Sequence, residues 1–226
     1  MPQRLRYGVS LRRTVMIRSV GRPRLHDEQT REALLVASTS LIAESGTGVL
    51  TVRSVADRAG TTTRAVYAVC GSKEGLVEAL AERAFSLLIE QVDKVPLTTD
   101  PGEDLVRAGV LGYRTFALEQ PDLFRFVFSA APPGTRIESE SSAPRANAYE
   151  RLTLRVERAL AAGLCGDHAV DEVALLWDAM CYGLAMRELC GSIDPSQAGR
   201  LWTVALHALL VGLATPPTSV PGPSSR

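Results

Sequence analysis

The chain has 226 residues, of which 46% are hydrophobic and 22% are charged, the balance of an ordinary soluble globular protein with one or two domains. Its formal net charge is zero, which excludes a uniformly basic protein that attracts polyanions through its total charge. The charge is unevenly distributed, because residues 1–24 carry seven arginines and no acidic residue. A basic arm is therefore predicted ahead of an acidic body.

The spacing of the cysteines and the hydropathy of the sequence indicate the cellular compartment of the protein. The four cysteines (Cys70, Cys165, Cys181 and Cys190) share no C-x-x-C spacing, which is typical of reduced thiols in a cytosol. The basic N-terminus is not followed by the apolar core of an export signal, and no uncharged apolar run is long enough to cross a bilayer. The sequence therefore predicts a cytoplasmic protein that does not enter a membrane.

The first predicted helix spans 27–45, where apolar residues recur at helical spacing. A second, short helix is predicted to begin after Thr51, because a threonine hydroxyl caps helix N-termini well. Leu50 and Val55 flank that cap at the spacing of a hydrophobic staple. Gly60 suits the left-handed residue that ends a helix, so this helix is expected to stop there.

A third short helix is predicted to follow almost at once, with Thr62 as its cap. Val66 and Val69 are expected to point inward. Two short helices joined by a glycine-containing turn are typical of a helix-turn-helix motif. The side chains predicted to face outward are those of Thr62, Thr63, Arg64, Tyr67 and Ala68.

Ser72 is predicted to cap a longer helix over 72–95, which ends before Pro96 and links two domains. Residues 97–101 form the expected linker. No strand pattern competes with the helical one, so the predicted fold is all-α. Further helices are expected at 102–119, 121–130, 145–163, 168–190 and 196–213, and the segments 130–144 and 215–226, rich in Pro, Ser and Gly, are expected to be mobile.

Residues 34–84 closely resemble the DNA-binding signature of the TetR family of regulators. The resemblance rests on the Thr-Val opening at 51–52, the Ala-Gly turn at 59–60, Tyr67, and the Ser-Lys-Glu-x-Leu run at 72–76. One departure is Cys70, where the family usually has a phenylalanine. The resemblance implies a one-component transcriptional regulator, a repressor that a small-molecule effector releases from a palindromic operator.

The resemblance also implies a division of the chain into functional parts. A homodimer is implied, formed by the last two helices of each subunit, on which Leu175, Leu176, Leu184, Leu189, Leu201, Leu206, Leu209 and Leu210 supply apolar faces; packing inside one subunit is the alternative for any single leucine. The predicted parts are a flexible basic arm (1–24), a three-helix DNA-binding domain (25–71), a connecting helix (72–95), an effector-binding and dimerisation domain (96–214) and a disordered tail (215–226).

Several side chains are candidates for DNA contacts. Arg64 is the best candidate for reading a guanine edge, whereas Thr51, Tyr67 and Lys73 resemble the family's phosphate contacts. Thr51 can equally serve only as a helix cap. The complete predicted set is Arg22, Arg24, Thr51, Arg53, Thr62, Thr63, Arg64, Tyr67, Ala68 and Lys73.

The segment 21–24, Gly-Arg-Pro-Arg, resembles the core of an arm that binds the minor groove, because proline keeps the chain extended and arginines seek its negative potential. A solvated basic tail is the alternative. The sequence leaves open whether translation starts at Met1 or Met16.

Aromatic residues of the second half are candidates for a mostly apolar pocket for a small, largely apolar effector. Trp177 and the run 182–185 resemble a Trp…His-Gly motif of one TetR subgroup, with tyrosine in place of histidine. Core packing is the alternative for each residue. The candidates are Tyr113, Phe116, Phe124, Phe126, Phe128, Trp177, Met180 and Tyr182.

No catalytic motif supports an enzyme: the chain has no G-x-S-x-G, P-loop, G-x-G-x-x-G or H-E-x-x-H pattern. Cys165 and His168 are too few ligands for a zinc site, so neither a metal nor another cofactor is expected. The alternative function is a helical ligand-binding or enzymatic protein whose helix-turn-helix has lost DNA binding.

Overall fold

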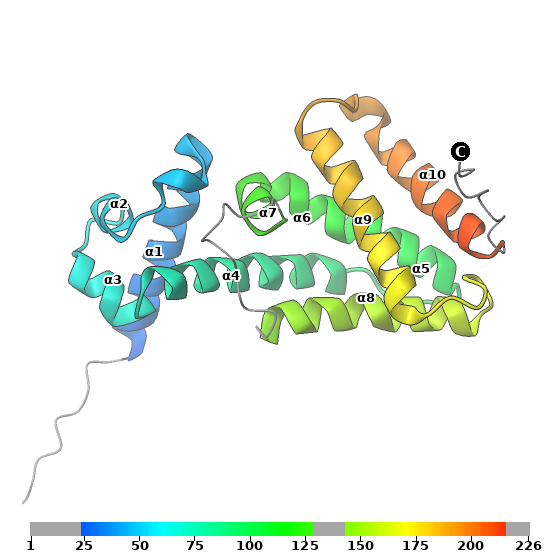
Figure 1. Cartoon of the computed structure of the whole chain (residues 1–226), viewed down its shortest axis with the longest axis horizontal. Helices are drawn as coiled ribbons and strands as arrows, with labels where there is room; N and C mark the ends of the chain where they lie inside the picture. Colours follow the sequence, from blue (N-terminus) through cyan, green and yellow to red (C-terminus); the bar gives the residue numbers. More distant parts are fainter. Residues whose placement is uncertain (1–23, 129–142, 216–226) are drawn as a thin grey trace, which may run out of the picture.

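The computed structural model describes residues 24–128 and 143–215, and every regular element in these two ranges is helical (Figure 1). The predicted all-α fold is confirmed. The elements are α1 (Arg24–Ser45), the 3₁₀ turn η1 (Thr47–Val49), α2 (Val52–Arg58), α3 (Thr63–Cys70), α4 (Lys73–Asp93), α5 (Pro101–Arg107), the π-helical segment η2 (Ala108–Tyr113), α6 (Arg114–Glu119), α7 (Pro121–Phe128), α8 (Ala143–Ala161), α9 (Val170–Leu189) and α10 (Pro195–Leu213).

The structure revises several predicted boundaries. Helix α1 begins at Arg24, three residues before the predicted start, and α5 begins at Pro101, which the sequence placed in the linker. Most of the predicted tail, of the predicted arm and of the segment 130–144 lies outside the described residues. Within the described ranges, no helix is both long and apolar enough to span a bilayer.

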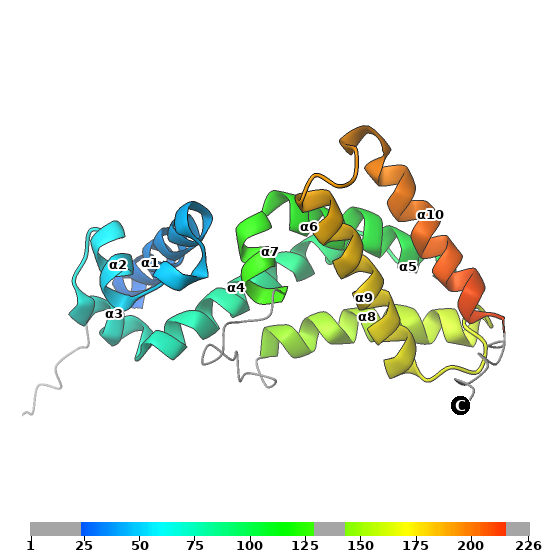
Figure 2. The same cartoon turned by 45° about the horizontal axis from the view of Figure 1, so that its top comes forward.

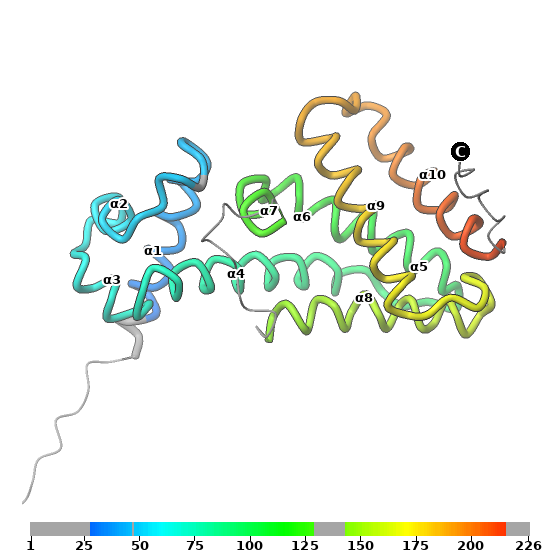
Figure 3. Tube along the Cα trace, in the orientation of Figure 1, coloured from blue at the N-terminus to red at the C-terminus, as the bar shows by residue number. Residues whose placement is uncertain are grey.

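Helices α1, α2 and α3 form a small domain at one end of the molecule (Figures 1 and 3). Its core contains Leu34, Val55 and Val66, none of which is exposed. Leu76 and Leu80, in the first half of α4, belong to the same continuous core. The N-terminal half of α4 is therefore part of this domain, although its C-terminal half lies in the other one.

The remaining helices form a bundle around the C-terminal half of α4. Helix α4 contacts α8, η2 and α7, and α8 in turn contacts α5 and α9. Helix α10 packs on α9 and α5 at the far side of the bundle (Figure 2). Helix α7 also contacts α1, so the two domains touch beyond their covalent link through α4.

The predicted continuous helix over 102–119 is interrupted by the π-helical segment η2. A Cβ atom on Gly112 would lie 3.0 Å from Cα of Val92 in α4, and one on Gly109 would lie 2.6 Å from Cδ1 of Leu206 in α10. The two glycines therefore let η2 approach both neighbours closely. A π segment adds a residue to a helical turn, so η2 departs from the continuous α-helical spacing that the sequence analysis expected.

A buried polar network joins α6, α9 and α10. The guanidinium of Arg114 donates to both carboxylate oxygens of Glu188, at 2.9 and 2.7 Å, and the Trp202 indole N–H donates to Glu188 at 2.9 Å. The hydrogen bonds from Arg114 hold the pKa of Glu188 below its ordinary value, against the opposing effect of burial, and the Trp202 bond lowers it further. The ionised carboxylate thus fixes three helices together.

Candidate DNA interface and ligand cavity

The predicted cap of α2 is confirmed. The Thr51 hydroxyl accepts a hydrogen bond from the Ser54 main-chain N–H at 3.0 Å, and the Ser54 hydroxyl accepts one from the Thr51 N–H at 3.0 Å. This reciprocal capping box satisfies two N–H groups that the helix itself leaves unpaired. Leu50 and Val55 are both buried in the same core, as their spacing indicated.

The turn between α2 and α3 follows the predicted chemistry. Gly60 has a φ of +64°, a left-handed conformation that glycine adopts without a steric penalty. The Thr61 N–H donates to the Ala56 carbonyl at 2.9 Å and the Gly60 N–H to the Asp57 carbonyl at 3.3 Å, which is the Schellman ending of a helix. Local hydrogen bonds therefore set the angle between α2 and α3.

Thr62 caps α3 by accepting a hydrogen bond from the Ala65 N–H at 3.2 Å. Val66 is buried and anchors α3 to the core. The outer face of α3 is formed by Thr63, Arg64, Tyr67 and Ala68, which are all exposed. Figure 2 shows α3 at the end of the molecule opposite α10. This face is free to meet a partner as large as a duplex.

Cations surround this outer face without strong internal partners. Arg64 and Lys73 form no ion pair with any residue in the described ranges, and the Arg53 guanidinium lies 4.0 Å from the Asp57 carboxylate in a fully solvated pair. Such a pair contributes little to stability, so all three cations remain available to phosphates. The chemistry of the face matches the hydrogen-bonding and cationic groups that read and hold DNA.

The junction between α3 and α4 depends on Gly75, a residue that the sequence analysis did not single out. The Ser72 hydroxyl caps α4 by accepting a hydrogen bond from the Gly75 N–H at 3.0 Å. A Cβ atom at Gly75 would overlap the main-chain carbonyl oxygen of Cys70. Cys70 is itself partly buried, and this burial raises the pKa of its thiol. The small side chains let α4 turn tightly away from α3.

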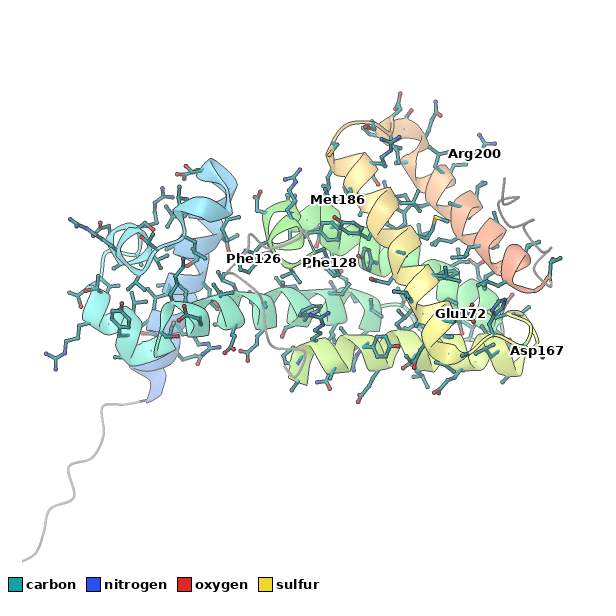
Figure 4. All side chains as sticks on the ribbon, in the orientation of Figure 1. Phe126, Phe128, Asp167, Glu172, Met186 and Arg200 are labelled. Atoms are coloured by element: carbon teal, nitrogen blue, oxygen red, sulfur yellow. The ribbon has the colours of Figure 1, made fainter. Side chains whose placement is uncertain are left out.

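A cavity of about 570 Å³ lies between α4, η2, α7, α8 and α9. Three of the eight predicted aromatic and methionine residues line it, namely Tyr113, Phe128 and Trp177. Phe128 lies at the C-terminal end of α7, where Figure 4 labels it with Phe126. The cavity is thus placed beside the connecting helix and not at the tip of the molecule.

The other candidates do not line this cavity. Phe116 and Phe124 are fully buried in the core, and Phe124 stacks on Phe128 and Tyr182 with centroid separations of 4.9 and 6.1 Å. These side chains pack behind the residues that line the cavity, because neighbouring positions on a helix point to different faces. The candidates that lie outside the lining are Phe116, Phe124, Phe126, Met180 and Tyr182.

The structure adds lining residues that the sequence analysis missed. Helix α4 contributes Phe85, Leu88, Ile89 and Val92, and α8 contributes a face that includes Leu152. The expected pocket was mostly apolar, but five charged side chains also line the cavity. These are Arg145, Arg151, Arg155, Asp171 and Asp178.

Comparisons with known proteins cover both domains of the chain. A profile described as "Bacterial regulatory proteins, tetR family" matches residues 34–80. A second, described as "Tetracyclin repressor-like, C-terminal domain", matches residues 106–209. The chain belongs to the TetR family. It is therefore a DNA-binding transcriptional regulator, of a family whose members are generally not enzymes.

Solved structures share the fold of this TetR-family chain at low sequence identity. The TetR family regulator PfmR from Thermus thermophilus is 21% identical, with 79% of this chain and 97% of that chain covered and a TM-score of 0.59. A TetR family transcription regulator from Marinobacter aquaeolei VT8 is 21% identical, with coverages of 83% and 98% and a TM-score of 0.61. A TetR variant from Acinetobacter baumannii AYE, in complex with minocycline, is 21% identical, with coverages of 80% and 94% and a TM-score of 0.56. No curated protein sequence matches the chain.

Most of the charged groups around the cavity of this TetR-family protein have partners. The Arg155 guanidinium donates to the carbonyls of Val92 and Val95 at the end of α4, at 3.2 and 3.0 Å. The Arg151 guanidinium donates to Asp93 at 2.8 Å. These bonds tie α8 to α4, so the position of α4 depends on the helix that forms the opposite wall of the cavity.

Proposed function

We propose that the protein is a dimeric repressor that leaves a palindromic operator when a small molecule occupies the cavity. The observation that carries the proposal is the double role of α4. Its first residue, Lys73, follows closely after α3, the proposed recognition helix, and its second half supplies Phe85, Leu88 and Val92 to the cavity wall. One continuous helix therefore joins the two sites.

We propose that α3 enters the major groove, with Arg64 reading a guanine edge and its neighbours excluding water. The cap at Thr51 leaves this residue exposed at a helix N-terminus, where a phosphate oxygen is favoured. Arg22 and Arg24 are proposed to reach the minor groove; Arg22 lies outside the described residues, and Arg24 begins α1. The proposed DNA contacts are Arg22, Arg24, Thr51, Arg53, Thr62, Thr63, Arg64, Tyr67, Ala68 and Lys73.

The proposed dimer interface is an apolar stripe on α10 beside a stripe of small residues on α9. Leu201, Val204 and Val211 follow helical spacing along α10 and are 40%, 54% and 69% exposed. On α9, Ala179 and Gly183 are also exposed and permit close approach. By contrast, the predicted interface residues Leu206 and Leu210 are buried inside the subunit. An isologous pairing of these stripes forms a four-helix contact across a two-fold axis.

The proposed release mechanism is a shift of α4. A dimer must hold its two recognition helices roughly 34 Å apart to occupy successive major grooves, so a small tilt of α4 prevents simultaneous docking. Helix α7 offers a second connection, because it contacts α1 and carries Phe128 in the cavity wall. An effector that binds the tilted state better must, by linkage, bind less tightly when operator is present.

The first test is binding of the dimer to DNA from the promoter region of its own gene, followed by fluorescence anisotropy. Affinity is expected to fall steeply between roughly 50 and 200 mM salt, because neutralised phosphates release counterions. The Arg64→Ala, Lys73→Ala double variant should lose most of this binding. The control is Arg83→Ala, since Arg83 pairs with Glu32 in the described structure and lies outside the proposed contacts.

If no promoter fragment is bound at any salt concentration, the repressor proposal is wrong. The protein would then be better described by the alternative, a helical ligand-binding or enzymatic protein with a helix-turn-helix that no longer binds DNA. Equal loss of binding in the Arg83→Ala control would likewise contradict the proposed contact surface. Arg64, which is exposed and forms no ion pair with any described residue, favours DNA binding over this alternative.

A further inference from the structure

We infer that the cavity takes an organic amine in its protonated form, held between Asp178 of α9 and Tyr113 of η2, with an aromatic or aliphatic body against Phe85, Phe128 and Trp177. The inference rests on the proposed function, in which this cavity is the effector site. It goes beyond that proposal because it names the charge and the anchoring atoms of the ligand.

The Tyr113 hydroxyl is the first anchor. Tyr113 is 8% exposed, and its hydroxyl is buried without a hydrogen-bond partner in the described structure. A buried hydroxyl that makes no hydrogen bond costs free energy. Burial, and then the negative charge of Asp178, raise the pKa of Tyr113 well above its ordinary value. Tyr113 therefore stays a neutral phenol whose oxygen can accept a hydrogen bond from a ligand.

The Asp178 carboxylate is the second anchor. Its side chain lines the cavity and accepts no hydrogen bond from any described residue. Burial raises the pKa of Asp178, and the more distant charge of Arg145 opposes that effect. Asp178 and Tyr113 line the same cavity, and the Asp178 charge raises the pKa of Tyr113, although no hydrogen bond joins the two side chains. A donor placed between them can satisfy both.

Most of the other charged side chains that line the cavity form hydrogen bonds with neighbouring residues, and one of them is exposed to solvent. The Asp171 carboxylate accepts a hydrogen bond from Tyr149 at 2.8 Å, and the Arg151 guanidinium donates to Asp93. The terminal nitrogens of Arg155 donate to main-chain carbonyls, whereas its buried Nε–H has no partner in the described structure. Arg145 is exposed and lies 6.0 Å from the centroid of the Phe85 ring. Of the two carboxylates that line the cavity, Asp178 is therefore the one without a hydrogen-bond or ion-pair partner among the described residues.

An ammonium group fits this arrangement better than a neutral or anionic one. Its N–H groups donate to Asp178 and Tyr113, and its charge removes the cost of holding a desolvated carboxylate without a partner. The aromatic rings of the lining also favour a cation over their faces. An anionic ligand could pair with Arg145 or with the Arg155 Nε–H, but it would be repelled by Asp178 and would leave that carboxylate without a partner.

The experiment uses three dansyl probes of matched size with the full-length dimer: dansylcadaverine, its N-acetyl derivative, and the dansyl amide of 6-aminohexanoic acid. Binding is measured from dansyl fluorescence and from quenching of the tryptophan emission, since Trp177 lines the cavity. The amine is expected to bind roughly tenfold more tightly than the acetylated probe, as for a hydrogen bond between charged groups. The carboxylate probe should bind least tightly.

Substitutions of opposite charge provide the controls. Asp178→Asn should abolish the preference for the amine, and Tyr113→Phe should weaken amine binding several-fold. Arg145→Gln should strengthen amine binding, because a repulsive charge is removed from the lining of the cavity. Asp171→Asn, on the same helix but with its carboxylate taken by Tyr149, should leave the preference unchanged. A purely structural role of these residues would not produce effects of opposite sign.

The failures of the two proposals are distinguishable. If the three probes bind equally, or if the carboxylate probe binds best, the amine inference is wrong while the cavity remains a ligand site. If none of the probes binds, both the amine inference and the assignment of the cavity as effector site are wrong. Promoter binding, measured separately, tests the DNA-binding half of the proposed function in either case.

Discussion

Gly75, in the first turn of α4, sits so close to Cys70 that a Cβ atom would overlap the Cys70 carbonyl oxygen. The same carbonyl accepts a hydrogen bond from the Ser72 N–H at 2.8 Å. We therefore expect Gly75→Ala to lower the free energy of unfolding by about 1–3 kcal/mol, the usual cost of overpacking. Urea denaturation measures this change.

The matched control for Gly75→Ala is Gly199→Ala in α10. There the nearest atom to a new Cβ is 3.8 Å away, at the Arg114 guanidinium, which is ordinary van der Waals contact. Alanine should stabilise that helix by up to about 1 kcal/mol. If both variants changed stability equally, the close approach of α4 to Cys70 would not be the reason for glycine at position 75.

Replacing Arg64 by alanine and replacing Lys73 by alanine are expected to change DNA binding in different ways. Arg64→Ala should relax base preference at one position of each half-site, at a cost of about 1–3 kcal/mol for the preferred sequence. Lys73→Ala should weaken binding uniformly and reduce the salt dependence by about one counterion. Selection of binding sites from a random library distinguishes them. An unchanged preference in the Arg64 variant would show that another residue reads the base.

A substitution at Val204 tests whether the exposed apolar stripe on α10 forms the dimer interface. Val204→Glu places a charge in the proposed interface and should shift the protein from dimer to monomer in sedimentation experiments. Operator affinity should fall with it, because both half-sites must be occupied. Val36→Glu is the control, since Val36 is 57% exposed on α1 and lies away from the stripe. A dimer that survives the Val204 substitution would place the interface elsewhere.

The ion pair between Arg114 and Glu188 predicts that the free energy of unfolding depends on pH. Because the folded-state pKa of Glu188 lies below its ordinary value of 4.5, its contribution is complete above pH 4.5 and is lost as pH falls through the folded-state value. Glu188→Gln should cost about 3 kcal/mol near neutral pH, since it leaves the Arg114 charge without its partner.

The difference between the Glu188→Gln variant and the wild type should narrow as the solution is acidified below pH 4.5, and denaturation at several pH values measures it. Glu44→Gln is the control. Arg58 also lowers the pKa of Glu44, through a side-chain hydrogen bond, but that pair is on the surface, where solvent screening makes it weak. A constant difference across the pH range would contradict the assigned role of the ionised Glu188.

The sequence by itself determined the helix-turn-helix, because that motif is built from short-range interactions. The caps at Thr51, Thr62 and Ser72 each bond to a residue three positions away, and the turn at Gly60 closes within five. Residue type and spacing along the chain are sufficient to predict contacts of this range. The fold class followed from helical periodicity for the same reason.

Only the tertiary structure decided the cavity and the interfaces. Tyr113 and Phe124 are both aromatic residues on helices, yet one lines the cavity and the other packs behind its wall. Periodicity assigns a residue to a face of its own helix but does not say which neighbour that face meets. The close approach of Gly112 to Val92, and the presence of Asp178 and Tyr113 in the lining of one cavity, depend on how helices distant in sequence cross. That crossing is set by packing of the whole core.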